Sequence, residues 1–396
     1  MQSEATVVAV PQAAPSAERR GYLTLALLCA AHFFIDLYSS ALAALQPVFV
    51  TTLGISLAQV GLLGGLLVFA SSTMQPAYGY LSDRFHSKLF TALAPAVAGI
   101  FISLAGLAPS YFALLLMVIA GGSGIASFHP QGSSRATYGI TENRGRWMAV
   151  FISSGTLGLA FGPTLFSGIV SKLGTSMTWV AMIPGVLMTV LLLWLMPDAP
   201  VETKKARFDW EPLKAVWKPL TILYLLVFIR SIVQISFTQF LPLYLNKERG
   251  MDLQSASFGL SIYLAAGAIG GFLGGNIADR FGGRTVILLS MILSVPFLAI
   301  FFLTTGMVSM IGLALGGLIL LFTIPVNVTM GQDLAPAQSG TVSALMMGFA
   351  WGTAGMIFIP LVGWAADYYT LHNALLALVV FPLVGFALAL KLPKHA

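Results

Sequence analysis

Apolar stretches of about 20 residues alternate with short polar segments along the chain. They lie at 22–45, 58–82, 89–108, 111–134, 147–171 and 177–196, and again at 219–245, 255–278, 285–304, 307–330, 339–366 and 373–391. A bilayer core about 30 Å thick needs about 20 apolar residues per helix. The pattern predicts an all-α membrane protein with twelve transmembrane helices in two six-helix bundles.

Polar segments divide this pattern into four parts. Residues 1–20 are rich in Ala, Pro and Ser, and we expect a disordered cytoplasmic tail. Residues 21–196 and 219–396 would form the two bundles, and residues 197–218 the cytoplasmic linker. The tail does not have the order of a cleaved signal peptide, whose basic residues precede its apolar core.

Composition agrees with a membrane protein. Hydrophobic residues make up 57% of the chain and charged residues 9%, whereas a soluble chain carries about 25% charged residues. The net charge of +6 is explained by membrane topology, and we expect no nucleic-acid partner. The single cysteine, Cys29, excludes a disulfide framework and a cysteine zinc site.

The basic residues predict which side of the membrane each loop faces. With the N-terminus in the cytoplasm, cytoplasmic segments hold 16 of the 20 Lys and Arg residues. The outer loops hold Lys172, Lys247 and Arg249, and Arg230 lies inside a span. By the positive-inside rule both termini are cytoplasmic, in a multi-pass protein of the inner membrane.

Three sequence patterns repeat between the halves at nearly the same offset. Gly79–Phe85 recurs as Gly275–Phe281, Gly155–Gly158 as Gly352–Gly355, and Gln46–Phe49 is echoed by Leu241–Tyr244. Such a repeat predicts two bundles related by an axis along the membrane normal. A substrate would bind between them at mid-depth as one bundle rocks on the other.

The loop after the second span of each half carries a glycine, an aspartate and arginines in the same order. The residues are Gly79, Asp83 and Arg84, and then Gly275, Asp279, Arg280 and Arg284. This motif resembles the cytoplasmic loop of the major facilitator superfamily. The resemblance implies a transporter whose loop charges close the cytoplasmic side in one state. The alternative is a static salt bridge. The first copy has Lys88 where the second has Arg284, and His86–Ser87 in place of two glycines, so we expect a weaker first gate.

The fifth span contains Gly158, Gly162 and Pro163. These residues resemble part of the glycine-rich motif of antiporters in the superfamily, although Phe166 and Ser167 replace its trailing glycine pair. The alternative is close helix packing with a proline kink.

Few ionisable residues lie deep in the predicted spans, where charges are costly and usually functional. Asp36 lies in span 1 with His32 one turn earlier, on the same helix face. Arg230 lies at nearly the same depth in span 7, and Gln234 and Thr238 continue its face. We expect Asp36 to take up a proton, His32 to tune or relay it, and Arg230 to bind an anion or pair with Asp36. A permanent ion pair is the structural alternative.

Span 4 carries Phe128-His129-Pro130-Gln131, in which His129 and Gln131 are candidate substrate contacts. Together with His32 and Asp36, this segment resembles the fosmidomycin-resistance family of drug efflux proteins. The resemblance implies proton-driven export of a small anion such as the phosphonate fosmidomycin. Gln131 stands where that family is expected to have an acid, which removes one titratable group.

Tyr38, Tyr263, Asn327 and Trp351 are further candidates for lining the cavity, with packing as the alternative. The sequence has no nucleotide-binding loop, catalytic triad or Cys/His metal cluster, so we expect no cofactor, no metal and no enzyme activity.

The sequence therefore predicts a monomeric, proton-coupled efflux antiporter for a small anionic or amphiphilic compound. Its alternatives are an uptake symporter for an organic anion that uses the same residues, and a non-transporting membrane receptor.

Overall fold

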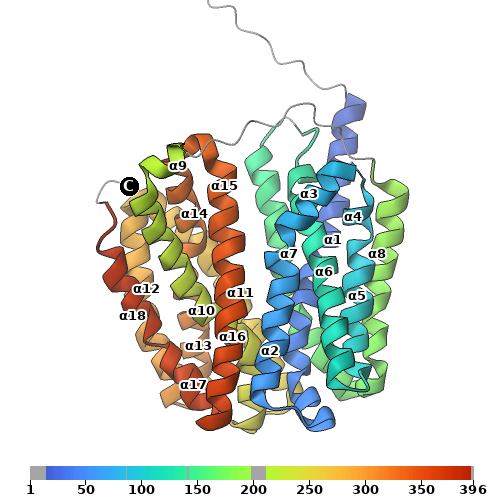
Figure 1. Ribbon diagram of the computed structural model, residues 1–396, viewed down its shortest axis with the longest axis vertical. Coiled ribbons are helices and arrows are strands. Elements are labelled where there is room, and N and C mark those ends of the chain that lie inside the picture. The colour runs from blue at the N-terminus through green and yellow to red at the C-terminus, as the bar shows by residue number, and fades with distance from the viewer. Residues whose placement is uncertain (1–14, 86, 141, 198–210, 394–396) are drawn as a thin grey trace, which may run out of the picture.

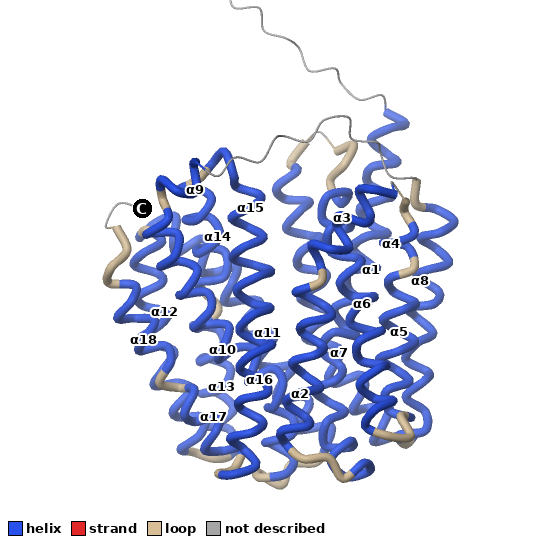
Figure 2. Tube along the Cα trace, viewed as in Figure 1, coloured by secondary structure: helices blue, strands red, loops and turns tan. Residues whose placement is uncertain are grey.

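The computed structural model describes residues 15–85, 87–140, 142–197 and 211–393, and these residues form a bundle of helices (Figures 1 and 2). Twelve helical segments are long and apolar enough to cross a membrane. They are Arg19–Leu53, Leu57–Ser82, Leu89–Leu107, Tyr111–Ala136, Arg144–Leu173, Thr175–Leu195, Trp217–Lys247, Leu253–Phe281, Gly283–Leu303, Gly306–Leu334, Ser339–Tyr368 and Leu371–Ala389. The predicted fold class is confirmed.

Half of the twelve spans are single helices, and the other half are built from two or three pieces. The first six spans contain α1 (Pro15–Leu53), α2 (Leu57–Val68), α3 (Gln75–Phe85), α4 (Leu89–Ala92), α5 (Ala94–Leu104), α6 (Tyr111–Ala136), α7 (Arg144–Leu173) and α8 (Met182–Leu195). After the short α9 (Glu211–Ala215) come α10 (Trp217–Lys247), α11 (Leu253–Phe281), α12 (Gly283–Leu303), α13 (Gly306–Leu320), α14 (Thr323–Leu334), α15 (Ser339–Ser343), α16 (Ala350–Tyr368), α17 (Leu371–Leu378) and α18 (Phe381–Ala389). Helices α1 to α8 form the first bundle and α10 to α18 the second (Figure 1).

Two boundaries differ from the sequence prediction. Helix α1 begins at Pro15, inside the predicted tail, and residues 1–14 lie outside the described part. The predicted linker contains α9 and the first two residues of α10, and its residues 198–210 are likewise outside the described part.

The sequence repeat is visible as repeated contacts. Gly79 lies against Pro130 in the first bundle, and Gly275 lies against Pro325 in the second. The Lys88 ammonium donates to the carbonyl of Met196 at 2.9 Å, and the Arg284 guanidinium donates to that of Leu390 at 2.8 Å. In each bundle a loop cation thus satisfies a carbonyl at the end of the sixth span, which favours a positive charge.

Glycines bring α7 into close contact with α1. A Cβ atom at Gly158 would overlap the carbonyl oxygen of Phe33, and one at Gly162 would overlap that of Leu37. Small residues allow such an approach of two helix backbones. The packing role considered for Gly158 and Gly162 is therefore observed, together with Pro163 inside α7.

The two bundles are joined at one end, called here the far end, which is opposite to the described chain ends (Figure 1). Helix α7 meets α11 through a 2.7 Å hydrogen bond between the hydroxyls of Thr164 and Ser261. Lys247 donates to the Thr51 hydroxyl at 2.9 Å. One cluster of buried apolar side chains also continues from the first bundle into the far half of the second, whereas a separate cluster fills the other end of the second bundle.

Packing of α7 on α1 gives a prediction with an internal control. Gly158→Ala should destabilise the protein by about 1–3 kcal/mol, because the added methyl group overpacks the α1–α7 contact. Gly145→Ala, on the same helix, should be neutral or slightly stabilising, since nothing lies within 4 Å of its Cβ position. Unfolding midpoints of the purified variants in detergent measure both effects. Equal midpoints would contradict the prediction.

Candidate functional site

Three ionisable side chains meet inside the first bundle. The Nε2 atom of His32 lies 3.3 Å from Oδ2 of Asp36 on the same helix, α1. The Nε2 atom of His129, on α6, lies 3.5 Å from Oδ1 of the same carboxylate. Each oxygen of Asp36 thus faces one imidazole nitrogen. We call these three residues the histidine–aspartate cluster.

The backbone of α7 fixes the orientation of His32. Its Nδ1 lies 2.8 Å from the carbonyl oxygen of Phe151, and since a carbonyl can only accept, Nδ1 carries a hydrogen. A neutral His32 therefore points the lone pair of Nε2 at Asp36. Two acceptors that face each other repel unless a proton lies between them, so the His32–Asp36 contact can accept a shared proton.

Aromatic rings and a glycine enclose the histidine–aspartate cluster. The His32 ring stacks on Phe151 with centroids 4.3 Å apart, and the Phe128 ring lies at 5.7 Å. A Cβ atom at Gly155 would overlap both His32 Nε2 and Asp36 Oδ2. The side chains of Asp36 and His129 nevertheless keep 13% and 25% of their exposure, so solvent-sized molecules can reach the cluster.

The same three side chains have donor types that suit a transition-metal ion. One ligand atom from each of His32, Asp36 and His129 lies within 4.8 Å of the others. The sequence predicts no metal, and it does not place His129 in contact with the other two. The cluster is therefore the place where the described residues could hold a cation, whether a proton or a metal ion.

Arg230 lies in the second bundle, on α10, and is 4% exposed. Its Nη1 donates to Gln234 Oε1 at 2.6 Å and its Nη2 to the Ser231 hydroxyl at 3.3 Å. The guanidinium carbon lies 5.9 Å from the centre of the Trp351 ring. The Nε atom is buried without a hydrogen-bond partner.

These contacts leave the charge of Arg230 uncompensated. Its recorded partners among the described residues are an amide, a hydroxyl and an aromatic ring, none of which carries a negative charge. Asp36 instead contacts two histidines. The permanent Asp36–Arg230 ion pair considered from the sequence is absent from the described residues in this conformation. A buried charge without a counter-charge is costly, so Arg230 is a candidate anion-binding residue.

Two predicted substrate contacts are packing residues in this structure. The Tyr38 hydroxyl donates to the carbonyl of Ala181 at 2.7 Å and accepts from the Gly185 amide at 3.0 Å, so it ties α1 to α8. Gln131 accepts from Thr91 at 2.6 Å and donates to the carbonyl of Ser87 at 3.2 Å. Neighbours within the first bundle therefore occupy the polar atoms of both side chains in this conformation, as the packing alternative for Tyr38 expects, and their contact with a substrate stays a prediction.

Tyr263 and Asn327 are fully enclosed in the second bundle. Both are 0% exposed, and the Tyr263 hydroxyl and both polar atoms of the Asn327 side chain have no partner. The packing alternative describes both residues in this conformation, and a role in binding substrate stays a prediction. Buried polar groups without a hydrogen-bond partner are rare. A second conformation of the protein in which these groups gain partners would explain them.

The gate motif is only partly described. Arg84, Asp279 and Arg280 are exposed, while the Asp83 side chain lies outside the described part of the structure. Arg284 lies against the end of α18 as described above. The predicted gate contact on the first loop therefore stays a prediction.

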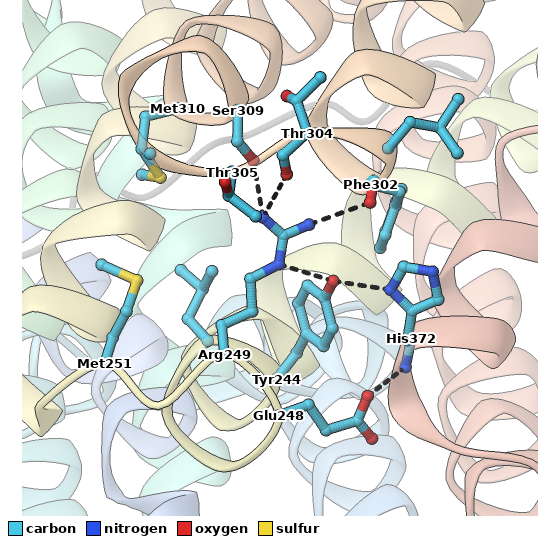
Figure 3. Close-up of a pocket in the computed structure, with 13 residues that line it drawn as sticks. Tyr244, Glu248, Arg249, Met251, Phe302, Thr304, Thr305, Ser309, Met310 and His372 are labelled. Atoms are coloured by element: carbon cyan, nitrogen blue, oxygen red, sulfur yellow. Dashed lines mark hydrogen bonds between the residues drawn. The ribbon is translucent and has the colours of Figure 1, made fainter.

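Sequence reasoning missed a polar network at the far end of the second bundle. Arg249 donates to the Tyr244 hydroxyl at 2.8 Å, to the Ser309 hydroxyl at 2.8 Å and to carbonyls that include Thr304 at 2.9 Å and Phe301 at 2.6 Å. The Tyr244 hydroxyl also contacts His372 Nδ1 at 2.9 Å, beside a cavity of about 670 Å³ (Figure 3). All three guanidinium nitrogens of Arg249 have partners, unlike those of Arg230.

Comparison with known proteins identifies the family. The model of the Major Facilitator Superfamily matches residues 28–360. The chain belongs to this superfamily. It is 30% identical over 386 residues to an uncharacterised MFS-type transporter, YfnC of Bacillus subtilis, covering 94% of this chain and 93% of the relative. It is 25% identical to the fosmidomycin resistance protein of Escherichia coli, covering 100% and 98%.

A solved structure supports the same fold. A bacterial homologue of the human lysosomal transporter Spinster, in an inward-facing and occupied conformation, superimposes with a TM-score of 0.80. The alignment covers 95% of this chain and 97% of that one at 16% identity. This superfamily member is therefore a multi-pass membrane transporter of small molecules.

The contrast between the two arginines gives a prediction. Arg230→Met should leave stability unchanged or raise it by about 1–4 kcal/mol, because it removes a buried charge that nothing balances. Arg249→Met should lower stability by about 3 kcal/mol or more, since it leaves several acceptors without a donor. Unfolding midpoints in detergent measure both. A marked loss of stability in Arg230→Met would show that Arg230 has a structural role.

Proposed function

We propose that this protein is a proton-coupled secondary transporter that exports a small organic anion in exchange for protons. The supporting observation is the separation of two buried groups: the histidine–aspartate cluster in the first bundle, and the uncompensated Arg230 in the second. Superfamily membership makes the protein a transporter, and these groups suggest what it carries and what drives it.

The proposed anion site centres on Arg230. A guanidinium presents several donors in a plane and suits phosphonate, sulfonate or carboxylate groups. The Nε atom is unpartnered, and Gln234 and Trp351 lie beside the charge. An anion bound there would balance a charge that the second bundle otherwise holds alone.

The proposed proton site is the histidine–aspartate cluster. Asp36 and His32 would share the transported proton, and His129 lies on the other carboxylate oxygen, where it can pass a proton or stabilise one. Partial exposure of Asp36 and His129 gives protons access.

Coupling follows from differential affinity. A proton in one bundle and an anion in the other each shift the balance between inward- and outward-open states by the difference in their affinity for the two. Export is favoured over uptake by the similarity to the fosmidomycin resistance protein. We further propose that the far end faces outward and both termini face the cytoplasm of the inner membrane, because the basic residues gather at the other end.

The test is proton movement in proteoliposomes that contain a pH-sensitive dye. Fosmidomycin and a panel of phosphonates, sulfonates and carboxylates would be added to the wild type, to Asp36→Asn and to Arg230→Gln. We expect an anion gradient to drive protons in the opposite direction in the wild type. Both variants should fall to the protein-free baseline, because each lacks one of the two sites.

A matched control is Asp252→Asn, which changes an exposed carboxylate that caps α11 far from the cluster. It should retain proton movement. Protons that move in the same direction as the anion would replace the export assignment with the uptake symporter. Full proton movement in Asp36→Asn would remove the cluster from the coupling path.

A further inference from the structure

One hydrogen-bonded contact between the bundles is made by a carboxylate at the far end. Asp367 lies at the end of α16, in the second bundle. Its Oδ1 accepts from the amide of Leu57 at 2.8 Å and its Oδ2 from the amide of Ala58 at 2.8 Å. Leu57 and Ala58 are the first two residues of α2, in the first bundle.

This contact completes the N-terminus of α2. The first amides of a helix have no partner within it. The third, that of Gln59, donates to the Ser56 hydroxyl at 3.2 Å, and the Gln59 side chain accepts from the Ser56 amide at 2.9 Å. This capping box leaves two amides unsatisfied, and Asp367 supplies acceptors for both. The helix is therefore fully capped only while the bundles are together at this end.

The charge and geometry of Asp367 suit a contact that fixes position. A carboxylate at a helix N-terminus is favoured by the helix dipole, and two bonds to successive amides set both distance and orientation. Asp367 is exposed, so water can replace its bonds when the contact opens. Such a contact is specific without being permanent.

The packing beneath Asp367 shows what its position controls. A Cβ atom at Gly61 would lie 2.7 Å from the carbonyl oxygen of Ile359, and one at Gly65 would lie 2.9 Å from the Pro360 ring. Helices α2 and α16 thus pack backbone to backbone from the far end inward. Deeper in the protein, each helix changes to a π-helical segment, Phe69–Thr73 and Ala344–Phe349, and these two segments touch.

π-Helical segments often mark functional bends, since they interrupt the regular helix ladder. At the far end, α2 and α16 are therefore packed tightly together, and this packed region extends inward as far as the two π-helical segments. We propose that Asp367 is the latch of this pair: it holds the far end shut by capping α2 across the bundle interface, and it must release for that end to open. This rests on the proposed function in requiring that the bundles separate there and that the far end faces outward.

The experiment measures how often the far end opens, with one introduced thiol as the reporter. Cys29→Ser removes the native thiol, and Gln239→Cys places one at the bundle interface, because the Gln239 side chain contacts Gly64 of α2. A membrane-impermeant maleimide is added to the outside of intact cells. Asp367→Ala should raise the labelling rate of this thiol by about two- to fivefold, the factor expected for losing a charged helix cap.

The matched control is Asp252→Ala. Asp252 also caps a helix at the far end, accepting from the amides of Gln254 and Ser255 at 3.0 Å, but entirely within the second bundle. It should leave the labelling rate unchanged. Asp367→Asn, which retains one acceptor oxygen, should give an intermediate rate. The amount of each protein in the membrane fraction verifies folding.

An unchanged rate in Asp367→Ala, or an equal rise in Asp252→Ala, would overturn the latch. The measurement uses neither substrate nor a proton gradient, so it is independent of the coupling assignment. If Asp36→Asn kept normal proton movement while Asp367→Ala raised labelling, the latch would stand and the proton site would be wrong.

Discussion

A charge inside a lipid-surrounded protein is costly unless something balances it, and the two bundles differ in how far they meet this constraint. In the first bundle, the Asp36 carboxylate lies between two imidazoles, either of which can share a proton with it. In the second, Arg230 has only neutral neighbours among its recorded contacts. The first bundle therefore contains a group that can neutralise itself with a proton, whereas the second, in the function proposed, is balanced by a bound anion.

The close approach of α1, α6 and α7 makes the first arrangement possible. Phe151 on α7 supplies the carbonyl that orients His32, and Gly155 one turn later leaves room for the His32–Asp36 pair. The glycines further along α7 bring its backbone against α1. The same helix reaches the second bundle through the hydroxyl pair of Thr164 and Ser261. A change in charge at the cluster is thus adjacent to a helix that takes part in closing the far end.

Hydropathy was enough to predict the twelve spans, because a helix that crosses lipid must be apolar along its length. The i,i+4 spacing correctly paired His32 with Asp36, since that contact lies within one helix. Spacing could not show that His129 joins them, because that depends on how α6 packs on α1. Nor could spacing identify the neighbouring helices to which the polar atoms of Tyr38 and Gln131 bond. Asp367 was missed because, in sequence, it is an ordinary acid at the end of a span.

Comparison of the two halves distinguishes features that support the fold from features that are candidates for binding ligands. Features that both halves share are structural: Gly79 and Gly275 each pack on a proline, and Lys88 and Arg284 each cap the end of a sixth span. The features that differ are those with unusual electrostatics. Ser231 stands at the position equivalent to Asp36, beside Arg230, and no histidine matches His129. The shared packing and capping contacts occur twice because each bundle must fold. In the function proposed, the two bundles bind different ligands, so each bundle needs a charged site of its own. Identical sites would bind the same ligand in both bundles.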